Sequence, residues 1–134
     1  MTIDLNNTLE QLDKHVWTEP EYDSHLVKTC HQLRKKPLRD FTTEDLRIMV
    51  GQNISLEFLI PVAIEQLERN ILAEGDFYAG DLLKSVLDSD SKFWIKNREL
   101  WSTVKKLYLN SKKVFESDST SKQIIKSFEH FEKI

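Results

Sequence analysis

Three carboxylates in one short glycine-containing segment are the residues best suited by type to chemistry. Glu74, Asp76 and Asp81 lie in the segment EGDFYAGD, residues 74–81. Paired carboxylates can perform acid–base catalysis or bind a cation. Phe77 and Tyr78 interrupt the alternating oxygen ligands that an EF-hand calcium loop needs. Three interpretations stay open: Asp76 makes a turn and Asp81 caps the next helix, the acids contact a partner, or they form a catalytic pair.

Other residue types that perform chemistry do not form recognisable constellations. His25 and His31 are six residues apart, which does not place them on one helical face at the spacing of a metal pair. The sequence contains no HExxH, no GxxxxGK[ST], no GxGxxG and no GxSxG motif. Cys30 is the single cysteine, so no disulfide or CxxC site is possible, and we expect it in the core. We therefore expect no catalytic residue, no metal site and no cofactor.

Length and composition are those of one globular domain. The chain has 134 residues, of which 40% are hydrophobic and 31% charged. We expect a single domain over residues 1–134. No apolar run approaches the roughly 20 residues of a membrane span, and the polar N-terminal residues do not resemble a signal peptide. These features predict a cytoplasmic protein without membrane contact.

Charge is divided unevenly along the chain. Residues 1–80 carry 8 Lys and Arg against 14 Asp and Glu, a net charge of −6. Residues 81–134 carry 11 against 8, a net charge of +3. The acidic part is either a set of ordinary solvated helix faces or a surface that attracts a basic partner. The one basic cluster, residues 34–39, lies at an expected helix end, where cations complement the helix dipole, so direct nucleic-acid binding is not indicated.

The spacing of apolar residues is helical throughout and predicts an all-α domain of about six or seven helices. A capping box of Thr18 and Glu21 predicts one helix start, and Thr42 predicts another. Gly51 is expected in the left-handed position that follows a helix. The first two apolar stripes are Leu5, Leu9, Leu12 and Val16, and then Tyr22, Leu26, Cys30 and Leu33.

The most apolar segment predicts the central helix of the domain. It surrounds Pro61, so the helix is expected to be kinked at this residue or to begin there, and to end at Asn70. A further long helix is expected to break near Lys96 and Asn97. The expected core residues are Leu59, Ile60, Ile64, Leu67 and Leu83.

Three phrases, in this order and spacing, resemble a known family. They are FTTEDLR at residues 41–47, GQN at 51–53 and EGDFYAGDLL at 74–83. Together they are similar to an immunity-protein family of bacterial contact-dependent growth inhibition systems, over about residues 33–90. The resemblance implies a small cytoplasmic protein that binds and blocks the C-terminal toxin domain of a large cell-surface effector. Many such toxins are nucleases with basic grooves, which an acidic protein would suit.

Three functions follow, in order of preference. The first is a stoichiometric toxin inhibitor without catalysis. The second is a helical adaptor or regulatory module that binds another protein, and the third is a small hydrolase or metal-dependent enzyme that uses the acids of residues 74–81. The candidate toxin-binding residues are Glu19, Glu21, Asp23, Glu74, Asp76 and Asp81.

Overall fold

The computed structural model describes residues 3–18, 24–116 and 121–134. These residues form nine α-helices and one short 3-10 helix, so the expected all-α class is confirmed. The only β contact among them is a single bridge between Glu74 and Ala79. The elements are α1 (Leu9–Asp13), α2 (His25–Leu33), η1 (Leu38–Asp40), α3 (Thr43–Gly51), α4 (Leu56–Arg69), α5 (Asp81–Leu87), α6 (Ser91–Lys96), α7 (Arg98–Asn110), α8 (Lys112–Glu116) and α9 (Lys122–Glu132).

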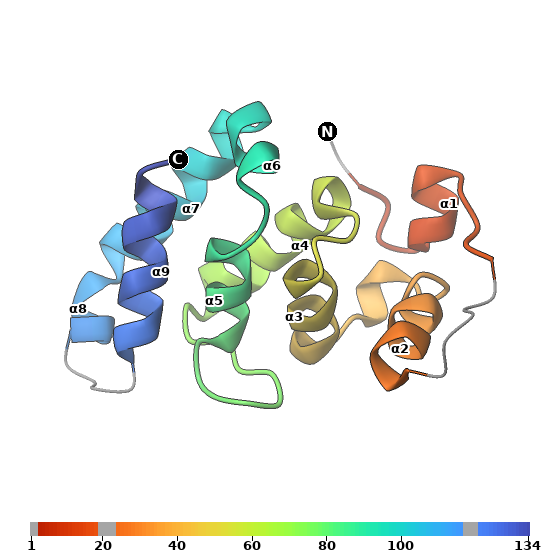
Figure 1. The fold of residues 1–134 in the computed structure, drawn as a ribbon, viewed down its shortest axis with the longest axis horizontal. Coiled ribbons are helices and arrows are strands. Elements are labelled where there is room, and N and C mark those ends of the chain that lie inside the picture. The colour runs from red at the N-terminus through yellow and green to blue at the C-terminus, as the bar shows by residue number, and fades with distance from the viewer. Residues whose placement is uncertain (1–2, 19–23, 117–120) are drawn as a thin grey trace.

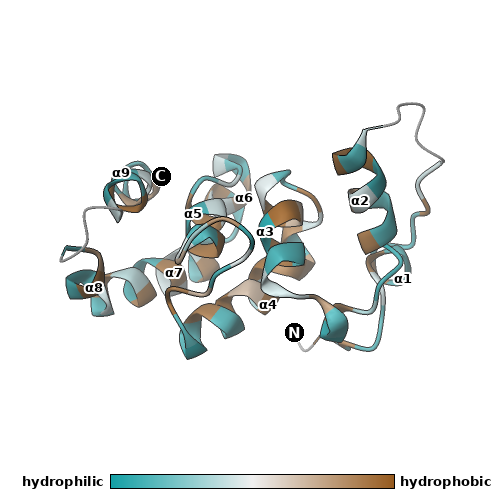
Figure 2. Ribbon diagram, turned by 90° about the horizontal axis from the view of Figure 1, so that it is seen from below, coloured by the Kyte–Doolittle hydropathy of each residue, from teal (hydrophilic) through white to brown (hydrophobic). Residues whose placement is uncertain are grey.

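The helices follow one another along the longest axis of the molecule. Figure 1 shows α1 and α2 at one end, α3, α4 and α5 in the middle, and α8 and α9 at the other end. Helix α3 packs against α4 and α5, while α9 packs against α5 from the far side. Helices such as α2 and α3 carry both hydrophobic and hydrophilic residues (Figure 2), as expected for helices that bury one face. Helix α5 therefore lies between α3 and α9.

The buried hydrophobic residues form one cluster that extends from Leu9 to Phe131. All five expected core residues are buried: Leu59, Ile60, Ile64, Leu67 and Leu83. Aromatic rings fill the end formed by α6 to α9, where Tyr108 stacks on Phe128 with ring centroids 3.7 Å apart. Trp94, which is fully buried, donates from its indole nitrogen to the Ser89 hydroxyl at 3.0 Å.

Several expected helix boundaries are confirmed. The Thr42 hydroxyl accepts from the Asp45 amide at 3.1 Å, and the Asp45 carboxylate accepts from the Thr42 amide at 3.0 Å, which is a complete capping box. Asn70 is the C-cap of α4, and Asn97 separates α6 from α7. The extra helices arise from that break and from the short α8.

Other boundaries differ from the sequence predictions. Helix α2 begins at His25 with Ser24 as its N-cap, later than the Thr18 capping box predicts, and Glu21 lies outside the described residues. Helix α4 starts at Leu56, so Pro61 lies inside it and does not begin it. Gly51 is the last residue of α3 and is not left-handed.

The left-handed conformation after α3 belongs to Asn53, with φ 57°, a residue type that tolerates this region. The two N-terminal apolar stripes are also partly wrong. Helix α1 ends at Asp13, so Val16 does not continue its apolar face and is 65% exposed. Leu26 lies on α2 but is 41% exposed, and Tyr22 lies outside the described residues.

Arg34 has a different role from the one expected of the basic cluster. Its side chain is buried and donates to both carboxylate oxygens of Asp13, at 2.8 and 2.9 Å, and to the His15 carbonyl at 2.6 Å. The guanidinium also lies 4.5 Å from the centre of the Trp17 ring. These contacts hold the segment that follows α1 against the end of α2.

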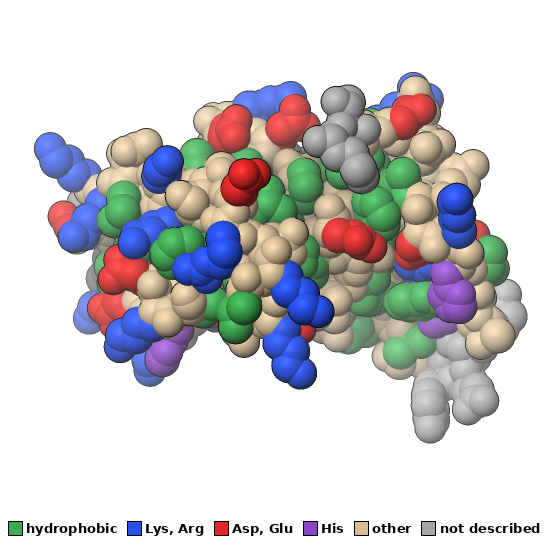
Figure 3. Space-filling view, turned by 90° about the horizontal axis from the view of Figure 1, so that it is seen from above, with side chains coloured by type: hydrophobic (Ala, Val, Ile, Leu, Met, Phe, Trp, Pro, Cys, Tyr) green, Lys and Arg blue, Asp and Glu red, His purple; other side chains and the backbone are tan. Residues whose placement is uncertain are grey.

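The uneven charge of the sequence is visible on the surface. Residues 98–116 and 121–134, which include α7, α8 and α9, carry 8 Lys and Arg against 4 Asp and Glu. Lys and Arg side chains are correspondingly numerous at that end of the molecule (Figure 3). The candidate acids of residues 74–81 lie before this basic end in the sequence: Glu74 and Asp76 between α4 and α5, and Asp81 at the first position of α5.

Candidate functional site

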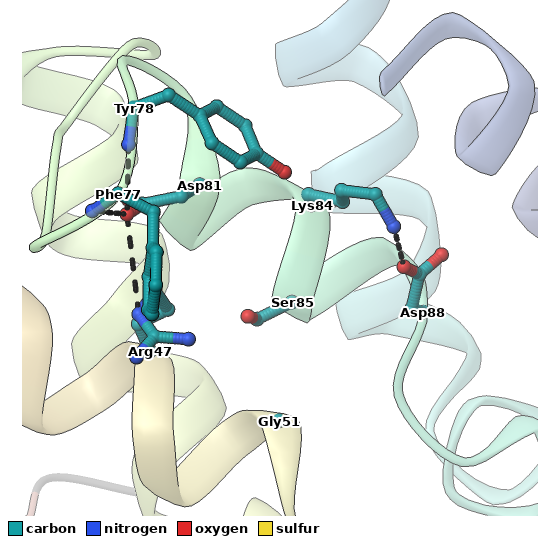
Figure 4. A pocket seen from close by; sticks show the side chains of 8 residues that line it. All are labelled: Arg47, Gly51, Phe77, Tyr78, Asp81, Lys84, Ser85 and Asp88. Atoms are coloured by element: carbon teal, nitrogen blue, oxygen red, sulfur yellow. Dashed lines mark hydrogen bonds and ion pairs between the residues drawn. The ribbon is translucent and has the colours of Figure 1, made fainter. Parts of the chain in front are cut away.

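The loop between α4 and α5 borders a surface hollow of about 290 Å³. Residues 74–80, called here the 74–80 loop, form one wall, and α3 and α5 supply the others (Figure 4). The lining residues are Arg47, Gly51, Phe77, Tyr78, Asp81, Lys84, Ser85 and Asp88. The hollow thus combines aromatic rings with charged groups of both signs.

The buried Asp81 carboxylate hydrogen-bonds the backbone of the 74–80 loop. Asp81 is only 3% exposed, and its carboxylate accepts hydrogen bonds from the backbone amides of Gly75 at 2.7 Å, Phe77 at 3.1 Å and Tyr78 at 3.4 Å. The N-cap of α5 is Gly80, at φ 91°, and no side chain caps this helix start. The expectation that Asp81 caps α5 is therefore wrong: its carboxylate bonds the preceding loop instead of the helix amides.

Two charged residues of α3 hold the other side of the loop. Glu44 accepts from the Asp76 amide at 2.9 Å and from the Nε of Arg47 at 2.6 Å. The Arg47 donors, helped by the Asp76 amide, hold the pKa of Glu44 below its usual value. Glycine suits this contact, because a Cβ at residue 75 would overlap a carboxylate oxygen of Glu44 and lie 3.2 Å from the Glu44 Cα.

The aromatic residues of the loop are left at the surface. Phe77 is 67% exposed and rests on Arg47, whose guanidinium carbon lies 4.3 Å from the ring centre. Tyr78 is 39% exposed, and its ring extends over the hollow toward Lys84 (Figure 4). Partial burial raises the pKa of the Tyr78 phenol.

The candidate acids therefore differ in position. Glu74 and Asp76 are exposed in the loop, whereas Asp81 is buried beneath it. Glu19, Glu21 and Asp23 lie outside the described residues. The structure places Glu74, Asp76 and Asp81 in one loop region but gives them different surroundings.

Sequence reasoning missed four residues of this region: Glu44, Arg47, Phe77 and Tyr78. Glu44 and Arg47 are three residues apart on one helix, a spacing that predicts their ion pair but not its contact with the loop. Phe77 and Tyr78 lie between two glycines, and this position was the available signal that they would not be core residues.

The arrangement is suited to binding more than to catalysis. Both Asp81 oxygens accept backbone amides, so this carboxylate holds the loop and is not free to transfer a proton. Among the described residues, no group of three or more His, Cys, Asp or Glu side chains could hold a metal ion. Cys30 is buried, and burial raises the pKa of its thiol, so it is not an activated nucleophile.

A family model described as CDI immunity proteins matches residues 11–104, which is more than two thirds of the chain. The chain belongs to the family of CDI immunity proteins. The resemblance based on residues 33–90 is confirmed, and the match extends on both sides of it. In this immunity protein, the 74–80 loop, α3 and α5 all lie inside the matched residues.

No curated protein and no solved structure matches the chain. None of the helices in the described ranges is both long and apolar enough to cross a membrane.

Proposed function

We propose that this protein neutralises the toxin domain of its cognate contact-dependent growth inhibition effector by binding to it. The observation that carries the proposal is the family match over residues 11–104. Binding alone is the mechanism, and it takes place in the cytoplasm, where a delivered toxin would act. The protein itself catalyses no reaction and binds no nucleic acid directly.

The finer proposal is that the toxin is a nuclease with a basic substrate groove. Glu74 and Asp76 are exposed on one loop, and the sequence up to residue 80 has a net charge of −6. Opposite charges on the two surfaces would speed association and suppress wrong partners. The six candidate toxin-binding acids keep this role as a proposal, with Asp81 contributing through the shape of the loop.

A helical adaptor that binds some other protein would use the same surface chemistry. What separates the two is protection: an adaptor does not rescue cells from a toxin. The family match favours the immunity function.

The direct test is co-expression with the toxin domain encoded immediately upstream. We expect the protein to restore growth and to purify with the toxin as a complex. If the protein neither binds nor protects against that toxin, the proposed function is wrong.

The electrostatic part is tested separately by charge reversal. Glu74→Lys with Asp76→Lys should slow association by about tenfold or more at low salt and weaken its salt dependence. The matched control is Glu129→Lys with Glu132→Lys, which changes the net charge equally on exposed positions of α9. A second variant, called the N-terminal variant, reverses the charges of Glu19, Glu21 and Asp23.

Each variant needs an unfolding midpoint beside its binding rate. Equal association rates in the loop variant, the N-terminal variant and the control would refute the steering mechanism. The immunity function would survive that result, because binding does not require steering.

A further inference from the structure

Phe77 is the most exposed large hydrophobic side chain among the described residues, at 67%. Its two neighbours in the loop, Asp76 and Tyr78, are also exposed. Aromatic side chains, Phe among them, are enriched in protein interfaces relative to the rest of the surface. The tip of the 74–80 loop therefore has the composition of an interface anchor.

The loop beneath this ring is held by bonds from two helices. Asp81 of α5 binds three loop amides, and Glu44 of α3 binds a fourth. The bridge between Glu74 and Ala79 closes the loop at its base, and the Gly80 amide bonds the Leu72 carbonyl at 3.2 Å. A loop ordered before binding loses less conformational entropy when a partner arrives.

Arg47 supports the Phe77 ring from below. Its guanidinium faces the ring at 4.3 Å while two of its nitrogens donate to Glu44. The ring is thus packed on one face and exposed on the other. A side chain in this position can enter a pocket on a partner without first being reorganised.

The charges near Phe77 indicate which charge the edge of such a pocket on a partner should have. The cations of the hollow are already paired, Arg47 with Glu44 and Lys84 with Asp88. Glu74 and Asp76 are exposed, and among the described residues their carboxylates form no hydrogen bond or salt bridge. Bonds to Glu44, and then the charges of Asp81 and Asp76, raise the pKa of Arg47, so three carboxylates surround this one cation. The unpaired charge around the ring is therefore negative, and a complementary surface is basic.

We propose that the 74–80 loop is the anchor of the toxin complex, with Phe77 entering an apolar pocket on the toxin that is edged by Lys or Arg side chains. These cations pair with Glu74 and Asp76. The inference rests on the proposed function and adds the surface, the central residue and the chemistry of the partner's pocket.

The test compares Phe77→Ala with Ile95→Ala. Ile95, on α6, is 60% exposed, so both variants remove an exposed apolar side chain outside the core. With the cognate toxin domain, we expect Phe77→Ala to weaken binding by at least about 30-fold, chiefly through faster dissociation. Ile95→Ala should stay within about twofold of the unsubstituted protein.

The basic edge of the pocket is tested with Asp76→Asn, which keeps the size of the side chain and removes its charge. We expect weaker binding at low salt and a reduced salt dependence, while Phe77→Ala should keep the salt dependence of the unsubstituted protein. If toxin binding by Asp76→Asn and by the unsubstituted protein depends equally on salt, the proposal that the pocket has a basic edge is wrong.

Failure of this inference and failure of the proposed function give different results. If the unsubstituted protein protects cells and Phe77→Ala binds the toxin as tightly as Ile95→Ala does, the loop is not the anchor. If the unsubstituted protein does not bind, the proposed function itself has failed. If the free protein is a dimer that Phe77→Ala converts to a monomer, the 74–80 loop contacts a second copy of this chain. That result would also overturn the proposal.

Discussion

Asp81→Asn tests whether one buried carboxylate holds the 74–80 loop in place. The substitution preserves the size of the side chain but replaces one acceptor oxygen with an NH₂ group, which cannot accept a hydrogen bond. The amide has one lower-cost orientation: its oxygen faces the Phe77 and Tyr78 amides, and its NH₂ faces Gly75. The bond lost is then the shortest of the three, from Gly75 at 2.7 Å.

The magnitude follows from that lost bond. A partly buried N–H that loses its acceptor costs about 1–3 kcal/mol. Every 1.4 kcal/mol corresponds to a factor of ten, so the exchange protection of the Gly75 amide should fall by about 5- to 150-fold. The substitution also removes the 3.9 Å ion pair of Asp81 with Arg47, but it leaves the hydrophobic core intact, so the loss of global stability should be of the same order.

Amide hydrogen exchange measured residue by residue is the assay, with denaturant unfolding beside it. Asp76→Asn is the control, because it makes the same chemical change at an exposed carboxylate in the same loop. Unchanged exchange at Gly75 in Asp81→Asn would refute the role of Asp81. Equal changes in Gly75 exchange in the two variants would refute it as well, because such changes would reflect only the lost charge.

Two further predictions concern the stability of the fold. Leu67→Ala, at a residue of α4 that is 1% exposed, should destabilise the protein by about 2–5 kcal/mol, and an unchanged urea midpoint would mean that α4 is not central. Asp13→Ala leaves the Arg34 guanidinium buried without its carboxylate and should cost about 3 kcal/mol at neutral pH, the low end for a broken buried pair because Asp13 is partly exposed. Hydrogen bonds from Arg34 hold the pKa of Asp13 below its usual value, so this stabilisation is present above about pH 4 and is lost as the pH falls through the lower folded-state pKa. The stabilities of the two proteins should converge in acid, and a difference that persists in acid would show that the ion pair is not its source.

Local sequence signals predicted the helices well where the determining contacts are local. The Thr42 and Asp45 capping box forms between residues three apart, so the sequence specifies it directly. Helical spacing also identified Leu59 and Leu67 as core residues, since α4 is covered by neighbours on its apolar face.

The same spacing rule was wrong at the N-terminal end of the chain, where α1 ends at Asp13, three residues before Val16. Val16 and Leu26 continue apolar stripes in the sequence, yet both are exposed. A stripe shows which face of a helix is apolar, but another part of the chain must cover it. Arg34 illustrates the reverse case, because only the fold brings Asp13 and Trp17 around its side chain.

The candidate site was predicted in part by residue type. The acids of residues 74–81 stand out in the sequence, but whether a carboxylate faces solvent or the backbone depends on three-dimensional contacts. Asp81 faces the loop amides, and Glu44 reaches Asp76 from 32 positions earlier in the chain. The Glu44 contact has no short-range signature. The Asp81 bonds are local, to amides three to six positions earlier in the chain, but an Asp at this position is equally typical of a cap for the helix that follows.

The 74–80 loop separates the residues that hold its shape from those it displays. Substitutions at Asp81, Glu44 or Gly75 disturb buried hydrogen bonds or a close backbone contact, and each costs stability. Substitutions at exposed positions such as Phe77 and Asp76 usually change stability by no more than about 0.5 kcal/mol. An inhibitor must recognise its own toxin and reject others, which requires that contact residues vary while the scaffold persists. If the 74–80 loop is the anchor proposed above, its exposed aromatic and acidic residues can be exchanged without rebuilding the hydrogen bonds beneath them, which satisfies both requirements.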